Sequence, residues 1–378
     1  MSWQPRRLDE LGSVSRGRSR HRPRDAAHLY GGPHPFIQTG DVKHAGLYIT
    51  DYTQTYSDAG LEQSKLWPAG TLCITIAANI ADTAILSIDA CFPDSVIGFK
   101  ADPHQADARF VKYLFDATIK RRAQQFSQGA TQDNLSQEKL LSLEFNIPMV
   151  DEQTRIADML STYDDLIENN RRRMALLEES ARLLYREWFV RLRFPGHEHT
   201  RIIDGVPEGW ERTTLEDALV LQRGFDLPTQ ARQAGTVPIY GSTGILGYHD
   251  KAKVSAPGVI TGRSGTLGEV QYVAEDYWPL NTALWVKEFR CVTPLFALFL
   301  LREMDLKQYN GGASVPTLDR KSVHRVEVLI PTSLLLRSFD EFAADVFAQI
   351  KNLNAQNQKL RAARDMLLPR LMSGELSV

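Results

Sequence analysis

The chain has 378 residues, of which 43% are hydrophobic, 24% charged and 9% aromatic. This composition excludes collagen-like, fibrous and disordered proteins. The 44 lysines and arginines against 46 aspartates and glutamates leave a net charge of −2. A free-standing, non-specific nucleic-acid binder is therefore disfavoured, because such proteins rely on a strongly basic surface.

No stretch approaches the 18 or so uncharged apolar residues that a membrane span needs, so we expect no membrane contact. The N-terminus is arginine-rich but lacks the apolar core of a secretory signal. The three cysteines lie far apart in sequence and form neither a disulfide framework nor a zinc motif: Cys73, Cys91 and Cys291. These features favour a protein of the reducing cytoplasm.

The first expected segment, residues 1–150, is a globular module. It begins with a basic stretch and continues with a strand-forming run over 72–88 that contains turn residues. A helix is expected over Arg109–Gln125. Short apolar runs separated by turn residues predict a twisted, β-rich α/β module.

Residues 151–194 are expected to form one long helix. Neither glycine nor proline occurs before Pro195, and apolar residues recur at alternating spacings of four and three, as in a coiled coil. The positions on this seam are Ile156, Leu160, Tyr163, Ile167, Asn170, Met174, Leu177, Ala181, Leu184 and Trp188. A polar linker, 195–209, follows. It contains His197-Glu198-His199, whose spacing does not match a metal motif.

The second module is expected over 210–335, with strand-forming runs at 237–249 and 258–273 and a helix over Pro294–Gln308. A second long helix is expected over 336–378. Its seam is Phe339, Ala343, Val346, Ile350, Leu353, Asn357, Leu360, Arg364, Leu367 and Leu371.

One seam on each of two helices predicts that they pack together, although two separate intermolecular coiled coils remain an alternative. Asn170 and Asn357 each interrupt a seam. A buried asparagine sets the register of such a pair at a cost in stability. The alternative is that either one faces solvent.

The two halves of the chain repeat each other. With a shift of 183, Leu140 aligns with Val323 and Ile147-Pro148 with Ile330-Pro331. With a shift of 207, Trp3 aligns with Trp210, and Arg16-Gly17 with Arg223-Gly224. The middles of the modules differ strongly. Two modules that share a scaffold but differ in their middle segments would suit a protein that recognises two different targets. The alternative is a structural duplication whose two copies have merely diverged.

Candidate DNA contacts in the second module lie in three glycine-containing segments and a lysine pair. Glycine lets backbone approach a ligand closely, arginine binds guanine or phosphate, and glutamine can pair with adenine. The candidates are Gln222, Arg223, Tyr240, Ser242, Lys251, Arg263 and Ser264, with Lys253 as a further phosphate contact. Tight strand turns and a solvated face are the alternatives.

Candidates in the first module are Arg16, Arg18, Arg20, Gln38, Thr39 and Asn79. The arginines belong to a stretch that also holds Arg22 and Arg24, and such a stretch serves phosphate contact or solubility. Ala77-Ala78-Asn79-Ile80 corresponds to the Gly262-Arg263-Ser264-Gly265 turn and has no arginine, which indicates that the two modules read different sequences.

The motifs of catalysis are missing from the sequence. No Pro-Pro pair exists, so the Asn/Asp-Pro-Pro-aromatic loop of amino methyltransferases is absent. No phosphate-binding G-x-x-x-x-G-K-[ST] motif and no Glu-x-Lys triplet occur either. We expect a protein that recognises DNA without cutting or methylating it, and that needs no cofactor.

The order of motifs resembles the specificity subunits of type I restriction-modification systems over essentially the whole chain. The resemblance is carried by the GA…L…IP segment with the helix after it, by PEGWERTTL, by GRSGTLGEVQYV with YWPLNTALWV, and by LRAARDMLLPRLMSGEL at the end. It implies two pseudo-symmetric α/β target-recognition domains separated by two long helices that form an antiparallel coiled coil.

The resemblance also implies partners: double-stranded DNA with a bipartite target, methyltransferase subunits that dock near the helices, and a translocating restriction subunit. Two readers joined by rigid helices measure the gap between half-sites, much as dimer spacing does in other DNA-binding proteins. The alternative is a coiled-coil interaction scaffold that reads no DNA sequence.

Overall fold

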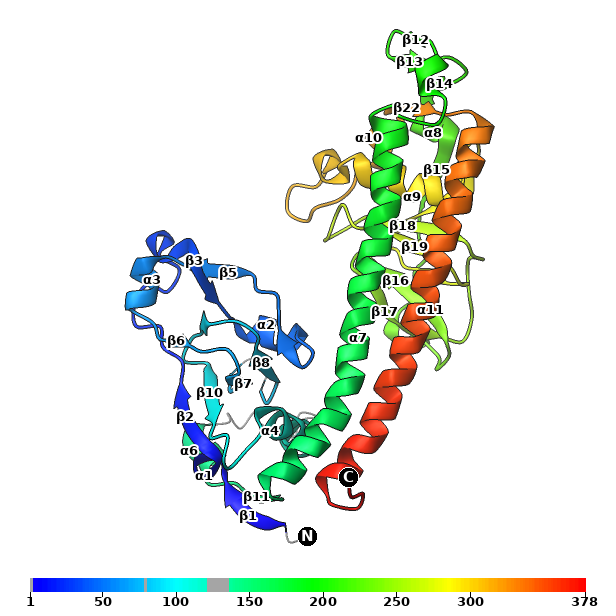
Figure 1. Ribbon diagram of the computed structural model, residues 1–378. Coiled ribbons are helices and arrows are strands. Elements are labelled where there is room, and N and C mark those ends of the chain that lie inside the picture. The colour runs from blue at the N-terminus through cyan, green and yellow to red at the C-terminus, as the bar shows by residue number, and fades with distance from the viewer. Residues whose placement is uncertain (1–2, 78–79, 121–135) are drawn as a thin grey trace. The chain divides into compact units, whose positions relative to one another are not determined.

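The computed structural model describes residues 3–77, 80–120 and 136–378 (Figure 1). The chain divides into two compact units. Unit 1 comprises Met1–Arg172 and Leu353–Val378, and unit 2 comprises Arg173–Asn352. Each unit therefore holds one globular module together with part of both long helices, α7 (Val150–Tyr185) and α11 (Ser333–Met372).

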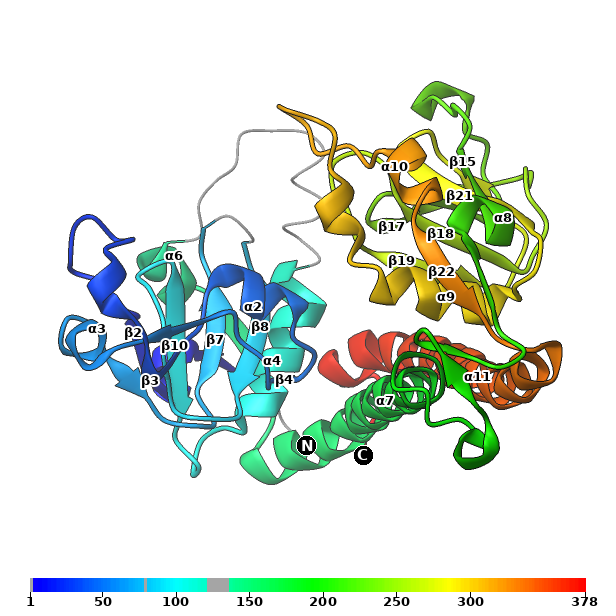
Figure 2. The same cartoon turned by 90° about the horizontal axis from the view of Figure 1, so that it is seen from above.

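Unit 1 contains a five-stranded sheet with the order β2-β10-β7-β8-β4 (Figure 2), a four-stranded sheet with the order β5-β3-β9-β6 and the two-stranded pair β1-β11. Helix α4 packs on the larger sheet against β7, β8 and β10. The elements of this module are β1 (Gln4–Arg7), α1 (Leu8–Leu11), β2 (Gly12–Arg16), η1 (Ala27–Leu29), β3 (Tyr30–Phe36), α2 (Thr39–His44), β4 (Tyr48–Ile49), β5 (Gln54–Tyr56), α3 (Asp58–Glu62), β6 (Leu66–Trp67), β7 (Leu72–Thr75), β8 (Thr83–Leu86), β9 (Ala90–Cys91), β10 (Val96–Ala101), α4 (Ala108–Phe115), η2 (Asp116–Lys120), α6 (Gln137–Leu141) and β11 (Glu144–Ile147).

Unit 2 contains a four-stranded antiparallel sheet, β15-β21-β18-β19, and a three-stranded sheet, β17-β16-β20. Its elements are η3 (Arg186–Val190), η4 (His197–His199), β12 (Ile202–Ile203), β13 (Val206–Pro207), β14 (Glu211–Thr214), α8 (Leu215–Ala218), β15 (Leu219–Arg223), η5 (Thr229–Ala231), β16 (Val237–Gly241), β17 (Gly244–His249), β18 (Gly258–Gly262), β19 (Val270–Val273), β20 (Trp278–Pro279), β21 (Ala283–Phe289), α9 (Pro294–Glu303), η6 (Leu306–Tyr309), α10 (Arg320–His324) and β22 (Glu327–Ile330).

The repeat predicted from sequence is confirmed by the topology of the two modules. Strands β2, β10, β7 and β8 hold the same order, all antiparallel, as β15, β21, β18 and β19. In each module a first strand pairs with the last, Gln4 opposite Ile147 in one and Glu211 opposite Ile330 in the other. The strand pairs β3–β9 and β16–β20 are likewise both parallel. The predicted mixed α/β class is confirmed.

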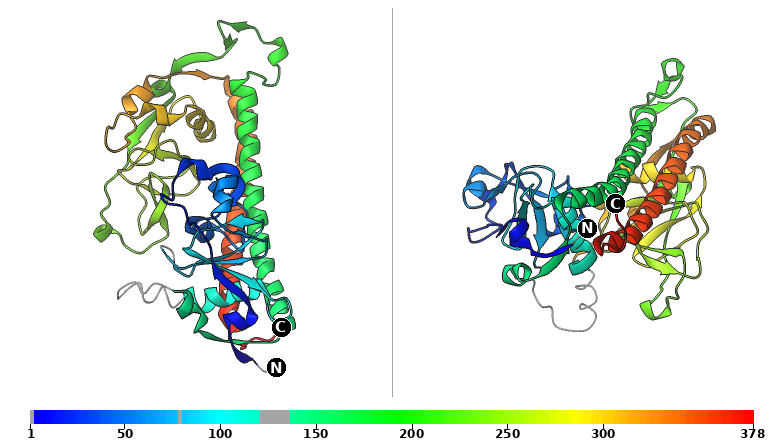
Figure 3. Two further views of the ribbon diagram at one scale, coloured as in Figure 1. Left: turned by 90° about the vertical axis from the view of Figure 1, so that its left-hand side faces the viewer. Right: turned by 60° about the horizontal axis from the view of Figure 1, so that its bottom comes forward.

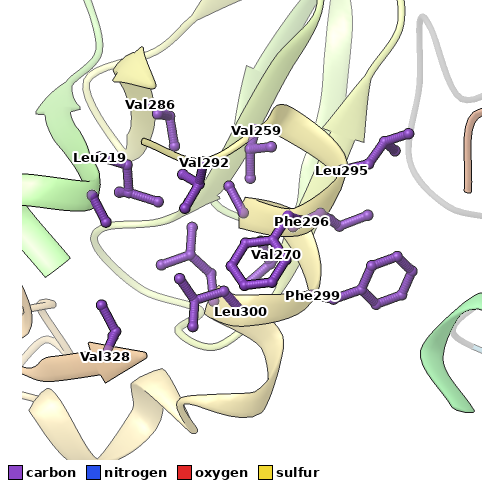
Figure 4. Close-up of a cluster of buried hydrophobic side chains, with 14 of the residues drawn as sticks. Leu219, Val259, Val270, Val286, Val292, Leu295, Phe296, Phe299, Leu300 and Val328 are labelled. Carbon is purple, nitrogen blue, oxygen red and sulfur yellow. The ribbon is translucent and has the colours of Figure 1, made fainter. Parts of the chain in front are cut away.

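The core of the second module lies between the four-stranded sheet and α9. Apolar side chains from β15, β18, β19 and β21 meet those of α9, as Figure 4 shows. Phe296 and Phe299 on α9 are fully buried there. The alternating pattern of the strands and the apolar face of the helix thus meet in one core.

Within each unit the two long helices run antiparallel. In unit 1 the beginning of α7 lies with the end of α11 (Figure 3), and Leu160 shares a buried cluster with Leu371. In unit 2 the end of α7 meets the beginning of α11, with the Tyr185 and Phe339 ring centroids 5.8 Å apart. The predicted seam positions Ile156, Leu160, Ile167, Ala181, Phe339, Ala343, Val346, Leu353 and Leu371 are buried.

Asn170 and Asn357 are each other's partners in unit 1. The Asn170 amide donates to Asn357 Oδ1 over 2.9 Å, and Asn357 donates to the Ile167 carbonyl over 3.3 Å. Both side chains are buried. A hydrogen bond between two buried amides is made in only one alignment of the helices, which is how such a pair selects a register.

The ends of the expected helices differ from those observed. The segment expected over 151–194 is helical only to Val190, because the backbone at Leu192 turns left-handed (φ 57°) and the Arg191 and Arg193 N–H groups bond back to Arg186 and Glu187. The last helix begins at Ser333, three residues before the expected 336, and ends at Met372. Of the helix expected over Arg109–Gln125, the last five residues lie outside the described part.

Candidate nucleic-acid interface

Three of the predicted segments of the second module meet at one end of its four-stranded sheet. Because β21 runs antiparallel to β15 and β18, its first residues lie opposite the last residues of both. Arg223 pairs with Leu284, and Gly262 pairs with Ala283. The third segment, the end of β16, joins them because Leu280 N–H bonds to the Tyr240 carbonyl over 2.8 Å.

Two glycines make this convergence possible. A Cβ on Gly224 would lie 2.1 Å from the Leu280 carbonyl oxygen, and one on Gly262 would lie 1.9 Å from the Thr266 carbonyl oxygen. No side chain fits at such distances, so glycine is needed for close backbone approach. Gly17 stands in the same relation to Phe92 in the first module, at 2.3 Å from its carbonyl oxygen. This explains why a glycine stands at this position in both halves.

The Arg263-Ser264 turn is bound to two neighbouring segments. The backbone N–H groups of Arg263 and Ser264 both donate to the Thr282 carbonyl, at 2.9 and 3.1 Å, and the Arg263 guanidinium donates to the Asn281 carbonyl at 2.9 Å. On the other side, Leu318 N–H donates to the Arg263 carbonyl over 2.8 Å. The turn is therefore held rigidly with Arg263 half-buried.

Arg223 is the most open arginine of this group. Its side chain is 51% exposed and forms an ion pair with Asp226 at 3.3 Å. Asp226 also accepts a hydrogen bond from the Asn281 amide. Gln222 and Ser242 are half-buried. An exposed pair in water is weak, so the arginine can exchange this carboxylate for another anion.

Tyr240 is placed differently from the other candidates. Its side chain is only 8% exposed, its ring lies 6.0 Å from that of Tyr277, and burial raises its pKa to about 12. Tyr240 therefore belongs to the core, beneath the candidate face, which is the surface on which the other candidate residues of this module lie. Lys251 and Lys253 are both exposed.

In the first module the basic stretch is partly bound to the protein itself. The Arg18 Nε donates to the Ser64 carbonyl over 2.8 Å, Arg22 donates to the Ser19 carbonyl over 2.8 Å, and Arg24 pairs with Asp94 at 2.8 Å. These arginines shape the loop. Within the residues that the structure describes, the side chains of Arg16 and Arg20 form no ion pair or hydrogen bond, so these two are the most available cations.

Gln38 and Thr39 stand at the beginning of α2. Thr39 is its first residue, and Gln38 N–H donates to Asp41 over 2.7 Å while its side-chain amide donates to Gln54 over 2.5 Å. Both side chains are half-buried. Asn79 lies outside the described residues. The strands before and after it in sequence, β7 and β8, correspond in strand order to β18 and β19.

The candidate residues of the second module that reach the surface offer cations, an amide and a hydroxyl: Arg223, Lys251, Arg263, Gln222 and Ser242. Across 3–77, 80–120 and 136–378, no three His, Cys, Asp or Glu side chains gather as metal ligands would. His197 bonds instead to the Phe194 carbonyl over 2.8 Å. In the same part of the chain, no helix is both long and apolar enough to span a bilayer.

The family profile described as "Type I restriction modification DNA specificity domain" matches residues 1–179 and 207–357. The chain belongs to this family. Its two matched stretches are the two repeated modules, each continuing into a long helix, which is the arrangement that the repeat and the topology show.

Named relatives agree with the family assignment. The chain is 25% identical over 415 aligned residues to the type I restriction enzyme MjaIX specificity subunit of Methanocaldococcus jannaschii, covering 100% of this chain and 94% of that protein. It is 20% identical to the HindI specificity subunit of Haemophilus influenzae, covering 90% of this chain and 94% of that one.

The fold is similar to that of a solved specificity subunit. The crystal structure of the type I restriction-modification S subunit from M. genitalium matches with a TM-score of 0.57 at 17% identity, covering 98% of this chain and 96% of that chain. The predicted architecture of two modules with long helices is confirmed as the fold of this specificity-domain family.

Sequence reasoning missed several residues that build the face of this specificity domain. The backbone carbonyl of Asn281 accepts a hydrogen bond from the Arg263 guanidinium. Nε2 of His324, on α10, accepts a hydrogen bond from the Leu221 N–H over 3.0 Å. Arg320 donates to the Leu221 carbonyl at 3.3 Å. The end of β15 is thereby held in place two residues before Arg223. Such contacts join residues about 100 positions apart in sequence, which no spacing rule reveals.

Proposed function

We propose that this chain is the DNA-reading, non-catalytic subunit of a type I restriction-modification complex. Each module reads one half of a bipartite double-stranded target. The paired helices set the gap and dock methyltransferase subunits, and a translocating restriction subunit completes the assembly. The complex works in the cytoplasm, and the chain needs no cofactor of its own.

The observation that carries this proposal is the double match to a DNA-specificity domain on two modules with one strand order. Support also comes from where the modules differ. The Arg263-Ser264 turn of the second module corresponds in the repeat to residues 77–80 of the first, which contain no arginine. Direct reading depends on the side chains presented to base edges, so modules with different turns read different half-sites.

The residues proposed to face DNA in the second module are Gln222, Arg223, Ser242, Lys251, Arg263 and Ser264. Those proposed in the first are Arg16, Arg18, Arg20, Gln38, Thr39 and Asn79. Tyr240 is proposed only as a support beneath the face, because a side chain this buried presents little surface to a ligand.

The test is co-expression with the cognate methyltransferase subunit, followed by genome-wide mapping of N6-methyladenine. The expected result is one bipartite motif with a fixed gap. Inserting one helical turn, about four residues, beside Asn169 should then change the gap and leave both half-sites unchanged. Half-sites that change while the gap stays constant would refute the role of the helices.

The second candidate is a coiled-coil scaffold that assembles proteins without reading DNA. It is favoured only by the length of the two long helices, 36 residues in α7 and 40 in α11. A stable complex with the methyltransferase that adds no methylation to the genome would favour this alternative.

A further inference from the structure

A lysine lies beside the equivalent strand in each module, with the two lysines one residue apart in register. Lys65 directly precedes β6, which runs antiparallel to β9 with Leu66 opposite Cys91. Lys253 directly precedes Val254, which forms an antiparallel bridge with Tyr277 beside β20. Strands β9 and β20 are themselves equivalent, since each pairs in parallel with the strand that follows the Arg-Gly segment of its module, β3 or β16.

In the first module, an aromatic ring and a hydroxyl hold the Lys65 ammonium. Nζ lies 3.6 Å from the centroid of Trp67 and 3.1 Å from Ser15 Oγ. The indole is 3% exposed and stacks on Phe92, with ring centroids 4.9 Å apart. A Cβ on Gly98 would lie 2.6 Å from the indole, so this glycine admits the ring. The Lys65 ammonium is therefore held against an aromatic ring that is itself fixed by packing in the core.

In the second module, aromatic rings hold the Lys253 ammonium in a similar way. Nζ lies 5.2 Å from the centroid of Phe225 and 5.9 Å from that of Trp278. The Phe225 ring also lies 6.1 Å from that of Trp285. Cation–π contacts of this kind orient an ammonium without neutralising its charge.

Both lysines lie beside the repeated Arg-Gly segment. The shift of 207 aligns Arg16 with Arg223 and Arg18 with Phe225. Phe225 contacts Lys253, and Arg18 donates to the carbonyl of Ser64, the residue before Lys65. Burial lowers the pKa of the Lys65 ammonium, and the Arg18 guanidinium lowers it further. Two cations are thus held together at this point of the first module.

Neither lysine forms an ion pair with a carboxylate in the described part of the chain. Charge neutralisation by the protein is therefore not the reason for their placement there. Apart from the repeated Arg-Gly pair, the candidate residues differ between the modules, while a lysine recurs at this place. A contact common to two readers of different sequences suits the part of DNA that is the same in every sequence, the phosphate backbone.

We propose that Lys65 and Lys253 are phosphate contacts, one in each module, which fix the modules on the DNA backbone while the neighbouring turns read bases. This inference rests on the proposed function. Lys65 is a residue that the sequence did not single out, because its neighbours Ser64 and Leu66 show no basic pattern.

The experiment uses the full complex with its methyltransferase and a fluorescein-labelled duplex of mixed sequence, with binding measured by anisotropy over a range of salt concentrations. The variants are Lys65→Gln, Lys253→Gln and the double variant. Matched controls are Lys100→Gln and Lys287→Gln. Both change exposed lysines toward the C-terminal ends of β10 and β21, away from the ends that lie beside the Arg-Gly segments.

Each single variant should reduce the slope of log affinity against log salt by about 0.9, and the double variant by about twice that, with the controls unchanged. The methylated motif in cells should keep its sequence. Lys65→Arg and Lys253→Arg should restore most of the slope, because charge is what matters.

An unchanged slope in the glutamine variants, or a motif altered at a base, would overturn the proposal. Loss of binding that arginine does not restore would also overturn it, because that result marks a structural role. Failure of the proposed function looks different: the unmodified complex itself would then show no salt-dependent binding and no methylated motif.

Discussion

Both modules pack on the long helices through apolar side chains, but a further contact at this junction differs between them although their folds repeat each other. In unit 1 a buried carboxylate joins three helices: Tyr113 on α4 donates to Asp164 on α7 over 2.6 Å, and Arg364 on α11 donates to the same carboxylate. In unit 2 the corresponding contact is an aromatic cluster of Tyr185, Phe189, Phe296, Phe299 and Phe339.

This difference shows which constraints the repeat imposes. Strand order, the Arg-Gly pair and the terminal strand pair are the same in both halves because backbone contacts define them. The contact between a module and a helix requires only that its volume is filled and that its buried polar groups are hydrogen-bonded. Polar and apolar side chains can therefore both form it. A polar contact is directional and leaves an uncompensated charge when broken, whereas an apolar one loses stability in proportion to the volume removed.

The largest effect is expected for Phe339→Ala in the aromatic cluster. Phe339 is fully buried and lies 5.3 Å from Phe189 and 5.8 Å from Phe299, centroid to centroid. Its truncation should lower the free energy of unfolding of unit 2 by about 3–5 kcal/mol, measured by urea unfolding. Phe342→Ala on the same helix, at 40% exposure, is the control and should cost far less. Equal losses would contradict the cluster's role.

A smaller loss is expected for Asp164→Asn in unit 1. The amide keeps an acceptor for Tyr113 but removes the charge that Arg364 pairs with, so the free energy of unfolding should fall by about 1–3 kcal/mol. Asp165→Asn, at an exposed neighbouring position, is the matched control. If both variants behave alike, the buried network does not join α4 to the helices as described.

Acidification should destabilise the second module through His324. Burial is the main cause that lowers its pKa below the ordinary 6.5, and its Nε2 accepts the Leu221 N–H only when unprotonated. The unfolded chain then binds the proton more readily, so stability falls as pH drops below about 6.5. Urea unfolding from neutral to acidic pH should show a weaker dependence for His324→Gln than for His199→Gln. Identical dependences would contradict this assignment.

The smallest change in stability is expected for the double variant Asn170→Leu and Asn357→Leu. Replacing a buried polar pair by apolar residues is often neutral or stabilising, but it removes the hydrogen bond that selects one alignment. Cysteine crosslinking across the seam should therefore detect more than one register. A single register in the double variant would show that the modules, and not the asparagines, align the helices.

Much of the fold could be predicted from sequence because periodicity and repetition carry it. The seam from Ile156 to Ala181, the strands on either side of the Arg263 turn, and the two constant shifts all correspond to observed elements. The left-handed residue that ends the first helix could not be predicted, because Leu192 is not a residue type that favours that conformation.

The candidate site was predictable only where glycine shaped it. Gly224 and Gly262 mark segments that do converge. The burial of Tyr240 and the contact of Lys65 with Trp67 depend on packing between strands far apart in sequence, so spacing gave no sign of either. The division of the chain at 150, 194, 209 and 335 remains a proposal, since the compact units include parts of both helices.

The most direct test of the account is an exchange of one module. Residues 210–335 would be replaced by the corresponding segment of a relative, and N6-methyladenine would be mapped after co-expression with the methyltransferase subunit. The account predicts a motif in which one half-site changes while the other half-site and the gap stay the same. A motif changed in both halves, or one left unchanged, would contradict the claim that each module reads its own half of the target.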